Sequence, residues 1–177
     1  VHLNKVRMLL FRIADEPWAI AATEVKDLIP LVTLQPYKGA CSPAEDALAD
    51  DIAATMHISG LLNYHGEYLP VIDVAQSVAQ QPAPIALSTR IAIVEAPVDS
   101  GLNGNPWSKK LGLILDQADQ TAYLSEAVDL PVNSPYLRAT LKGPEGIVQQ
   151  LAIASFFNAV AEPRSPLSGE LVYAAGP

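Results

Sequence analysis

Residues 58–74, ISGLLNYHGEYLPVIDV, constrain the fold of this 177-residue chain more than any other stretch. Two apolar runs flank the segment 64–67, whose glycine tolerates the positive φ that a tight hairpin turn requires. The pattern therefore predicts two strands joined by a short turn. Asp73 ends the second run and is followed three residues later by Gln76, which is the spacing of a capping box. We therefore expect a helix to begin at the sequence VAQSVA.

Fifteen prolines and ten glycines divide the rest of the chain into short segments whose lengths suit strands. Further strands are expected at 6–13, 18–22, 31–34, 90–95, 111–115, 121–124, 136–141 and 147–153, with a turn or bend at 116–120. Thr23 is expected to cap a single helical turn over 24–29 that Pro30 stops, and residues 154–161 have the pattern of a short amphipathic helix. About nine or ten short strands are typical of barrels or a sandwich, so the fold class is mainly β.

Composition limits the domain organisation and the classes of partner. The formal charge of −8 argues against nucleic-acid binding, because neutralising phosphates requires a basic face. No apolar run is long enough to span a bilayer, which argues against direct membrane insertion. A single cysteine, Cys41, fits a reducing cytoplasm. One domain is expected over residues 1–161, with an acidic insertion at about 37–56, followed by a tail rich in Pro, Ser and Gly at 162–177.

A search for catalytic chemistry finds no phosphate loop, dinucleotide fingerprint, nucleophile elbow or zinc-ligand spacing, so no cofactor and no metal are expected. Asp73 and Asp116 each end an apolar strand. Either carboxylate could serve as an acid or base in a small β-barrel enzyme, which would require a raised pKa in a closed pocket. A helix cap explains Asp73 and a turn residue explains Asp116, and these structural roles are favoured over catalysis.

The hairpin resembles the hallmark of the CheW-like chemotaxis adaptor family, G-x-x-N-x-[R]-G-x-x-x-P-V-I-D-[LV], through Gly60, Asn63, Gly66, Pro70, Val71, Ile72, Asp73 and Val74. The segment FRIADEPWAIAATEVKDLI is similar to the family's N-terminal run through Phe11, Ile13, Trp18, Ala19, Ile20, Val25, Asp27 and Leu28. RIAIVEA followed by KKLGLILDQADQ resembles the family's second-barrel hairpin. Together the three blocks span residues 8–157.

The resemblance implies a fold of two small interleaved five-stranded β-barrels with two or three short helices. It also implies a non-catalytic cytoplasmic adaptor at membrane-associated receptor arrays, which couples the cytoplasmic tip of a chemoreceptor to the regulatory domain of a CheA-type histidine kinase. Carried over by position, the candidates for the receptor groove are Val25, Asp27, Asn63, His65 and Gly66. The candidates for the kinase interface are Leu113, Leu115 and Asp116.

Two departures from the family pattern bear on function. His65 stands where the family usually has arginine, so a contact made by a permanently charged guanidinium is replaced by an imidazole. The segment 37–56 is longer than the family's usual connection. Both suggest a specialised pathway such as surface sensing or pilus motility. A regulatory CheW-like domain of a larger kinase, or of a fusion with a receiver domain, is the alternative within the same family.

Overall fold

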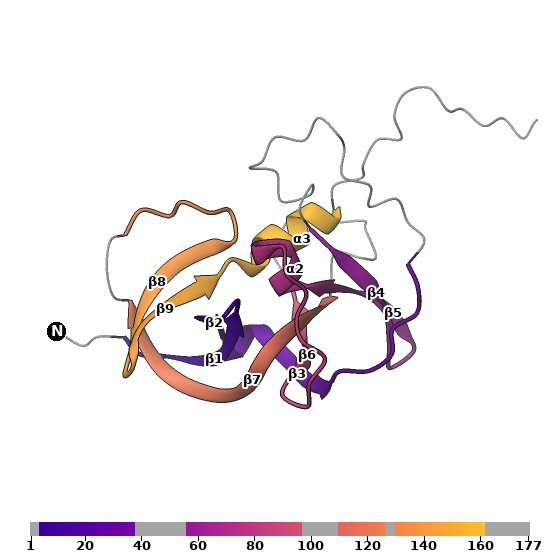
Figure 1. The fold of residues 1–177 in the computed structure, drawn as a ribbon, viewed down its shortest axis with the longest axis horizontal. Helices are drawn as coiled ribbons and strands as arrows, with labels where there is room; N and C mark the ends of the chain where they lie inside the picture. Colours follow the sequence, from indigo (N-terminus) through magenta and orange to yellow (C-terminus); the bar gives the residue numbers. More distant parts are fainter. Residues whose placement is uncertain (1–3, 38–55, 97–109, 127–129, 162–177) are drawn as a thin grey trace, which may run out of the picture.

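The computed structural model describes residues 4–37, 56–96, 110–126 and 130–161. These ranges contain nine strands and three short helical segments, which confirms the mainly β class. Nearly all of the expected acidic insertion and the whole of the expected C-terminal tail lie outside the described residues. Figure 1 shows the strands in two groups on either side of the helices α2 (Val74–Ala79) and α3 (Ile153–Ala161).

The first group, called sheet 1 here, is a closed ring of five strands. It contains β1 (Val6–Ile13), β2 (Glu16–Ala21), β9 (Gly146–Leu151), β8 (Leu137–Gly143) and β7 (Lys110–Glu126). Each strand pairs with the next in this order, and β7 pairs with β1 to complete the ring. Ring closure leaves no edge strand with unpaired backbone groups.

The second group, sheet 2, also has five strands, in the order β3, β6, β7, β5 and β4. Its further members are β3 (Val25–Pro30), β4 (Ile58–Tyr64), β5 (Glu67–Asp73) and β6 (Arg90–Glu95). The segment after β3 approaches β4, where Gln35 and Leu61 exchange backbone hydrogen bonds of 2.9 and 2.8 Å. Gly60 permits this approach, because a Cβ there would lie 2.6 Å from the backbone oxygen of Gln35.

Strand β7 belongs to both sheets and joins them (Figure 1). Its first residues pair with β5 and β6, whereas residues from Asp116 onward pair with β1. The turn or bend expected at 116–120 is an irregularity within this continuous strand. Gln117 has a φ of 51°, and the register with β1 shifts opposite it. A β-bulge accommodates the polar residues without ending the strand.

Two other expectations near the N-terminus are wrong. The helical turn expected over 24–29 is instead a 3-10 helix at Ala22–Glu24 followed by β3. No strand forms at 31–34, and the next residue, Gln35, makes an isolated bridge to Leu61. The pairing of β3 with β6, sixty or more residues away, overrides the local signals of Thr23 and Pro30, because strand pairing is decided by tertiary contacts.

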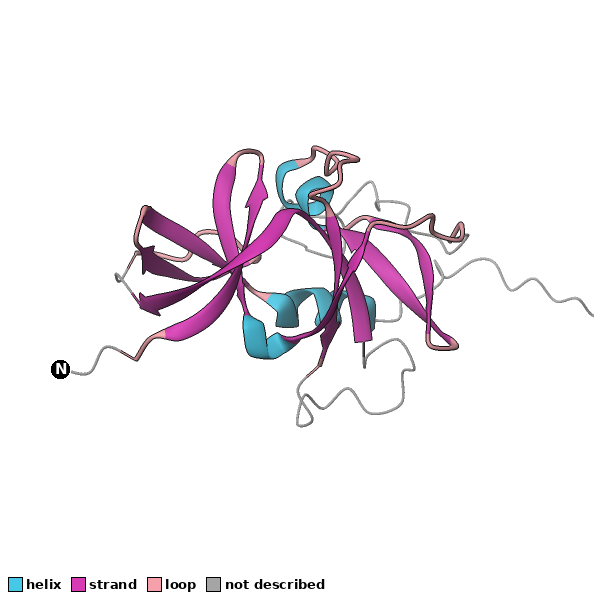
Figure 2. Ribbon diagram, turned by 90° about the horizontal axis from the view of Figure 1, so that it is seen from below, coloured by secondary structure: helices cyan, strands magenta, loops and turns pink. Residues whose placement is uncertain are grey.

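Three apolar clusters form within the part of the chain that the structure describes. The largest lies between the sheets, where side chains of β1, β2, β6 and β7 pack against α2 and α3; Figure 2 shows helical segments between the two groups of strands. Phe156 and Phe157 of α3 are completely buried there. A smaller cluster fills the interior of each sheet. The two sheets therefore share the largest apolar cluster.

Candidate functional site

One end of sheet 2 gathers polar side chains from all five of its strands, and we call this group the charged end. Its members are Lys26 and Asp27 of β3, Tyr64 of β4, Glu67 of β5, Glu95 of β6 and Lys110 of β7. The strand register explains the grouping, because Tyr64 lies opposite Glu67 and Glu95 lies opposite Lys110. Neighbouring strands thus present their terminal side chains side by side.

Two ion pairs run across the charged end. Lys26 Nζ lies 2.7 Å from Glu95 Oε2, and Lys110 Nζ lies 2.8 Å from Glu67 Oε2. The hydrogen bond from Lys26 lowers the pKa of Glu95 below its ordinary 4.5, and the bond to Glu67 raises the pKa of Lys110. Exposed ion pairs contribute at most about 1 kcal/mol each to stability. Their larger effect is to fix an alternating pattern of charge on the surface.

Asp27 connects β3 to the hairpin of β4 and β5. Its Oδ2 accepts a hydrogen bond of 3.1 Å from the Tyr64 hydroxyl, while its Oδ1 accepts one of 2.8 Å from the backbone N–H of Leu28. Desolvation, together with the hydrogen bond to Asp27, raises the pKa of Tyr64, so this hydroxyl remains a donor at neutral pH. The structure therefore brings together two regions that sequence reasoning singled out separately.

The turn of the hairpin has the form that its sequence predicted. His65 and Gly66 have φ values of 52° and 88°, and a type I′ turn requires positive φ at both central residues. Asn63 Oδ1 accepts a hydrogen bond of 3.0 Å from the backbone N–H of Gly66. Asn63 and Gly66 therefore shape the turn. His65 is exposed, and its ring packs edge-on against Tyr64 at 4.3 Å.

The remaining groove and interface candidates have different environments. Val25 is half-buried and packs against the central core next to the charged end. Leu113 and Leu115 are 0% and 1% exposed and lie in the same core. Asp116 is half-buried in β7, where it lies opposite Arg12 of β1. Of the three kinase candidates, only Asp116 has accessible surface.

Sequence reasoning missed four members of the charged end: Lys26, Glu67, Glu95 and Lys110. Each is a charged residue at or near the end of a strand, which is a weak signal by itself. Lys26 and Glu95 are 69 positions apart in the chain, and Glu67 and Lys110 are 43 positions apart. Only the register of the strands reveals that they meet.

Asp73 has a structural role as the cap of α2. Its carboxylate accepts hydrogen bonds from the backbone N–H of Gln76 at 3.0 Å and from that of Ala83 at 3.0 and 3.3 Å. The capping expectation is confirmed. The two cavities described on sheet 1 are lined by neither Asp73 nor Asp116. These observations give no support to the acid–base enzyme hypothesis.

Two wider searches covered the described parts of the chain. In these parts, no group of three or more His, Cys, Asp or Glu side chains is arranged to hold a metal ion. None of the helices formed by these residues is long and apolar enough to cross a membrane.

Comparisons with known proteins bear on this arrangement. Residues 7–160 match the family model of the CheW-like domain. Among solved structures, the scaffolding protein TtCheW from Thermoanaerobacter tengcongensis is similar with a TM-score of 0.57 and 16% identity, over 85% of this chain and 86% of that one. No match is found among curated proteins. At that identity the structural likeness supports the fold alone, whereas the family match covers nearly all of the described residues. The chain therefore belongs to the CheW-like domain family.

Proposed function

We propose that this protein is a non-catalytic adaptor of a bacterial chemosensory array. In this role it couples the cytoplasmic tip of a chemoreceptor to the regulatory domain of a CheA-type histidine kinase. The observation that carries the proposal is the meeting of Asp27 with the hairpin turn at the charged end, in a chain of the CheW-like family. Its place is the cytoplasm, at membrane-associated receptor arrays.

The charged end is the proposed receptor face. Val25 contributes apolar surface beside it, and the fixed pairs of opposite charge supply a pattern that a complementary helical surface can match. Charges at the rim of an interface set orientation and association rate more than affinity. His65, in place of the arginine usual in the family, presents an exposed imidazole at the tip of the turn. This substitution motivates the assignment to a specialised pathway, such as surface sensing or pilus motility.

The proposed kinase face combines Asp116 with an apolar loop. Ile85 and Leu87 are each 94% exposed, more than any other large apolar side chain in the described residues. Hydrogen bonds fix their loop on both sides: Ala83 donates to Asp73, and the Thr89 hydroxyl donates to the Pro84 carbonyl at 2.6 Å. A fixed loop that displays two aliphatic side chains costs little ordering entropy on binding, which favours a protein–protein contact. The matching surface would be an apolar patch on the kinase's regulatory domain.

Isothermal titration calorimetry against a helical-hairpin receptor fragment and against the kinase regulatory domain tests the proposal. Lys26→Ala should weaken receptor binding several-fold at low salt, and added salt should reduce the difference. Lys142→Ala, the same change at an exposed position of sheet 1, is the matched control and should bind as the wild type does. Failure of the wild-type chain to bind either partner would overturn the adaptor proposal. Equal effects of the two substitutions would overturn the location of the receptor face.

A further inference from the structure

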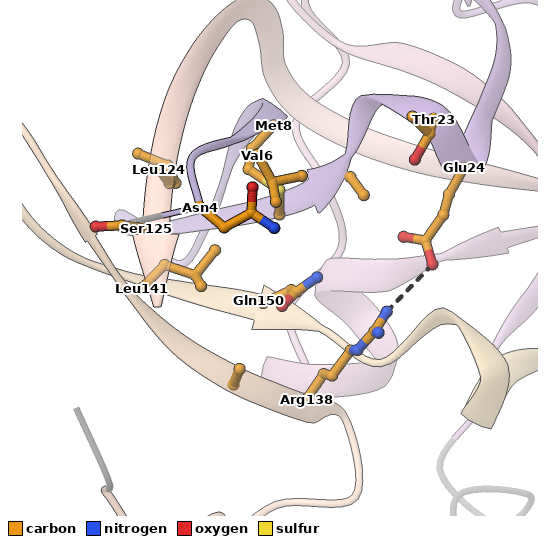
Figure 3. A pocket seen from close by; sticks show the side chains of 12 residues that line it. Asn4, Val6, Met8, Thr23, Glu24, Leu124, Ser125, Arg138, Leu141 and Gln150 are labelled. Carbon is orange, nitrogen blue, oxygen red and sulfur yellow. Dashed lines mark hydrogen bonds and ion pairs between the residues drawn. The ribbon is translucent and has the colours of Figure 1, made fainter. Parts of the chain in front are cut away.

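The outer face of sheet 1 carries one exposed side chain from each of four strands, and we call this set the outer row. Its members are Arg7 of β1, Tyr123 of β7, Lys142 of β8 and Ile147 of β9. Each is next in the chain to a residue of the interior cluster, and three of those neighbours, Met8, Leu124 and Leu141, line the inside of the sheet in Figure 3. Since successive side chains of a strand point to opposite faces, the outer row points away from the interior.

The register of the strands makes the outer row continuous. Arg7 lies directly opposite Tyr123, and Lys142 lies directly opposite Ile147. Ser125 lies opposite Lys142, so Tyr123, two residues before Ser125, is the diagonal neighbour of Lys142. Diagonal neighbours remain within reach of long and aromatic side chains. Neighbouring strands are about 4.8 Å apart, so a row across four strands is roughly 14 Å long.

The positive charges of the outer row are not compensated by other described residues. The ion pairs formed within the described parts of the chain include neither Arg7 nor Lys142. The guanidinium of Arg7 donates only to the neutral hydroxyl of Thr121, which lies 3.4 Å from both Nε and Nη2. Arg138, the other cation of β8, differs because it pairs with Glu24, as the dashed line in Figure 3 shows. The outer row therefore presents free cations on a chain whose formal charge is −8.

Two large apolar side chains stand beside these cations. Tyr123 is 65% exposed and Ile147 is 55% exposed, the highest values for large apolar side chains in the described strands. Tyrosine is enriched at protein interfaces, because its ring supplies apolar area and its hydroxyl can form a hydrogen bond. The row thus alternates cationic and apolar groups from strand to strand. A surface of this kind is complementary to one that alternates anionic and apolar groups.

We propose that the outer row binds an acidic segment of a partner protein, in which carboxylates alternate with apolar side chains. The carboxylates would pair with Arg7 and Lys142, and an aromatic or aliphatic side chain would pack on Tyr123 and Ile147. A fully extended segment of about four or five residues spans the roughly 14 Å of the row. The row shares no residue with the proposed receptor and kinase faces, so this partner would be bound in addition to them.

NMR of the full chain tests this inference, with the Ile147 methyl groups and the Tyr123 ring as reporters. The probe is a capped peptide, Asp-Glu-Phe-Glu-Asp-Leu. Its control is Asn-Gln-Phe-Gln-Asn-Leu, in which amides replace the carboxylates without changing the size of the side chains. Saturable shifts of both reporters are expected with the acidic peptide and not with the amide peptide. Added salt should weaken the binding, because the paired charges are exposed.

Substitutions locate the binding on the outer row. The double variant Arg7→Gln, Lys142→Gln should bind the acidic peptide about three- to tenfold more weakly, because two exposed charge pairs are lost. Tyr123→Ser should also weaken binding, about threefold or more. Glu145→Gln removes a competing carboxylate from the exposed turn after Lys142 and should strengthen binding, an effect that a loss of fold would not produce. Lys26→Gln removes a cation that is already paired at the charged end, so it is the matched control and should leave binding unchanged.

Three results would overturn the inference: equal affinity for the amide peptide, unchanged affinity in the double variant, or peptide binding that shifts neither reporter. Vesicles of anionic phosphatidylglycerol test the other source of negative charge. If they bind the chain through Arg7 and Lys142 while the acidic peptide does not, the row is a membrane contact and the inference is wrong. If the double variant does not fold, the comparison of the two peptides on the wild type decides. The measurements use the chain alone, so they do not depend on the proposed adaptor function.

Discussion

Replacing Asp73 with alanine should lower the free energy of unfolding by about 2–3 kcal/mol. The first part is the helix cap, because removing an N-cap carboxylate such as the one bound by Gln76 costs about 1 kcal/mol. The second part is the backbone N–H of Ala83, which would lose both carboxylate contacts. A buried donor left unpaired costs about 1–3 kcal/mol, and the lower half of that range applies because Ala83 is half-buried.

Urea unfolding followed by circular dichroism measures this loss, and the melting temperature should fall by roughly 4–12 °C in a chain of this size. Asp73→Asn is the matched control: asparagine is also a good N-cap and keeps one acceptor oxygen, so it should cost less than about 1 kcal/mol. An alanine variant as stable as the wild type would refute the reasoning. An asparagine variant as unstable as alanine would show that the negative charge, and not the cap, matters.

Further predictions concern both sheets and the exposed loop. Gly60→Ala would place a Cβ 2.6 Å from the backbone oxygen of Gln35, so it should lower the free energy of unfolding in urea by about 1–3 kcal/mol. An unchanged midpoint of the urea unfolding curve would contradict this close approach. The double variant Ile85→Glu, Leu87→Glu should be as stable as the wild type, since both side chains are exposed. It should bind the kinase regulatory domain more weakly in calorimetry, and an unchanged affinity would exclude this loop from the interface. Lys26→Met should raise the pKa of Glu95 in carboxyl NMR titrations. Because the pKa of Glu95 is lowered in the folded state, the small stabilisation by this pair is complete above about pH 4.5 and is lost as the pH falls through the lowered pKa. If the pKa of Glu95 is the same in Lys26→Met as in the wild type, the pair does not form in solution.

Leu113 and Leu115 show what a match to a family motif leaves open. The run LGLIL, at 111–115, is apolar at every position except its glycine. A continuous apolar run is typical of a strand buried on both faces, because an alternating pattern would leave one face polar. Residues 111–115 of β7 are buried, and Gly112 leaves room for Val71, whose side chain would lie 2.9 Å from an added Cβ. Leu113 and Leu115 therefore support the core, and their match to a family motif reflects packing.

The sequence by itself determined the features that depend on residues close together in the chain. The hairpin of β4 and β5, its turn at His65 and Gly66, and the Asp73 cap follow from backbone preferences and from hydrogen bonds spanning three residues. The family resemblance rests on this hairpin and on two further local blocks of sequence, which explains why it identified the fold. The helix misassigned over 24–29 marks the limit of local signals.

Tertiary structure decided which distant residues meet. The two ion pairs of the charged end join residues that are 69 and 43 positions apart in the chain, and the contact between Glu24 and Arg138 joins residues 114 positions apart. The sharing of β7 by two sheets depends on strand register. Register is set by which faces are buried together in the three apolar clusters, and a shift of one residue would send every side chain of a strand to the opposite face. No local pattern carries that information, because it belongs to the packing of the whole chain.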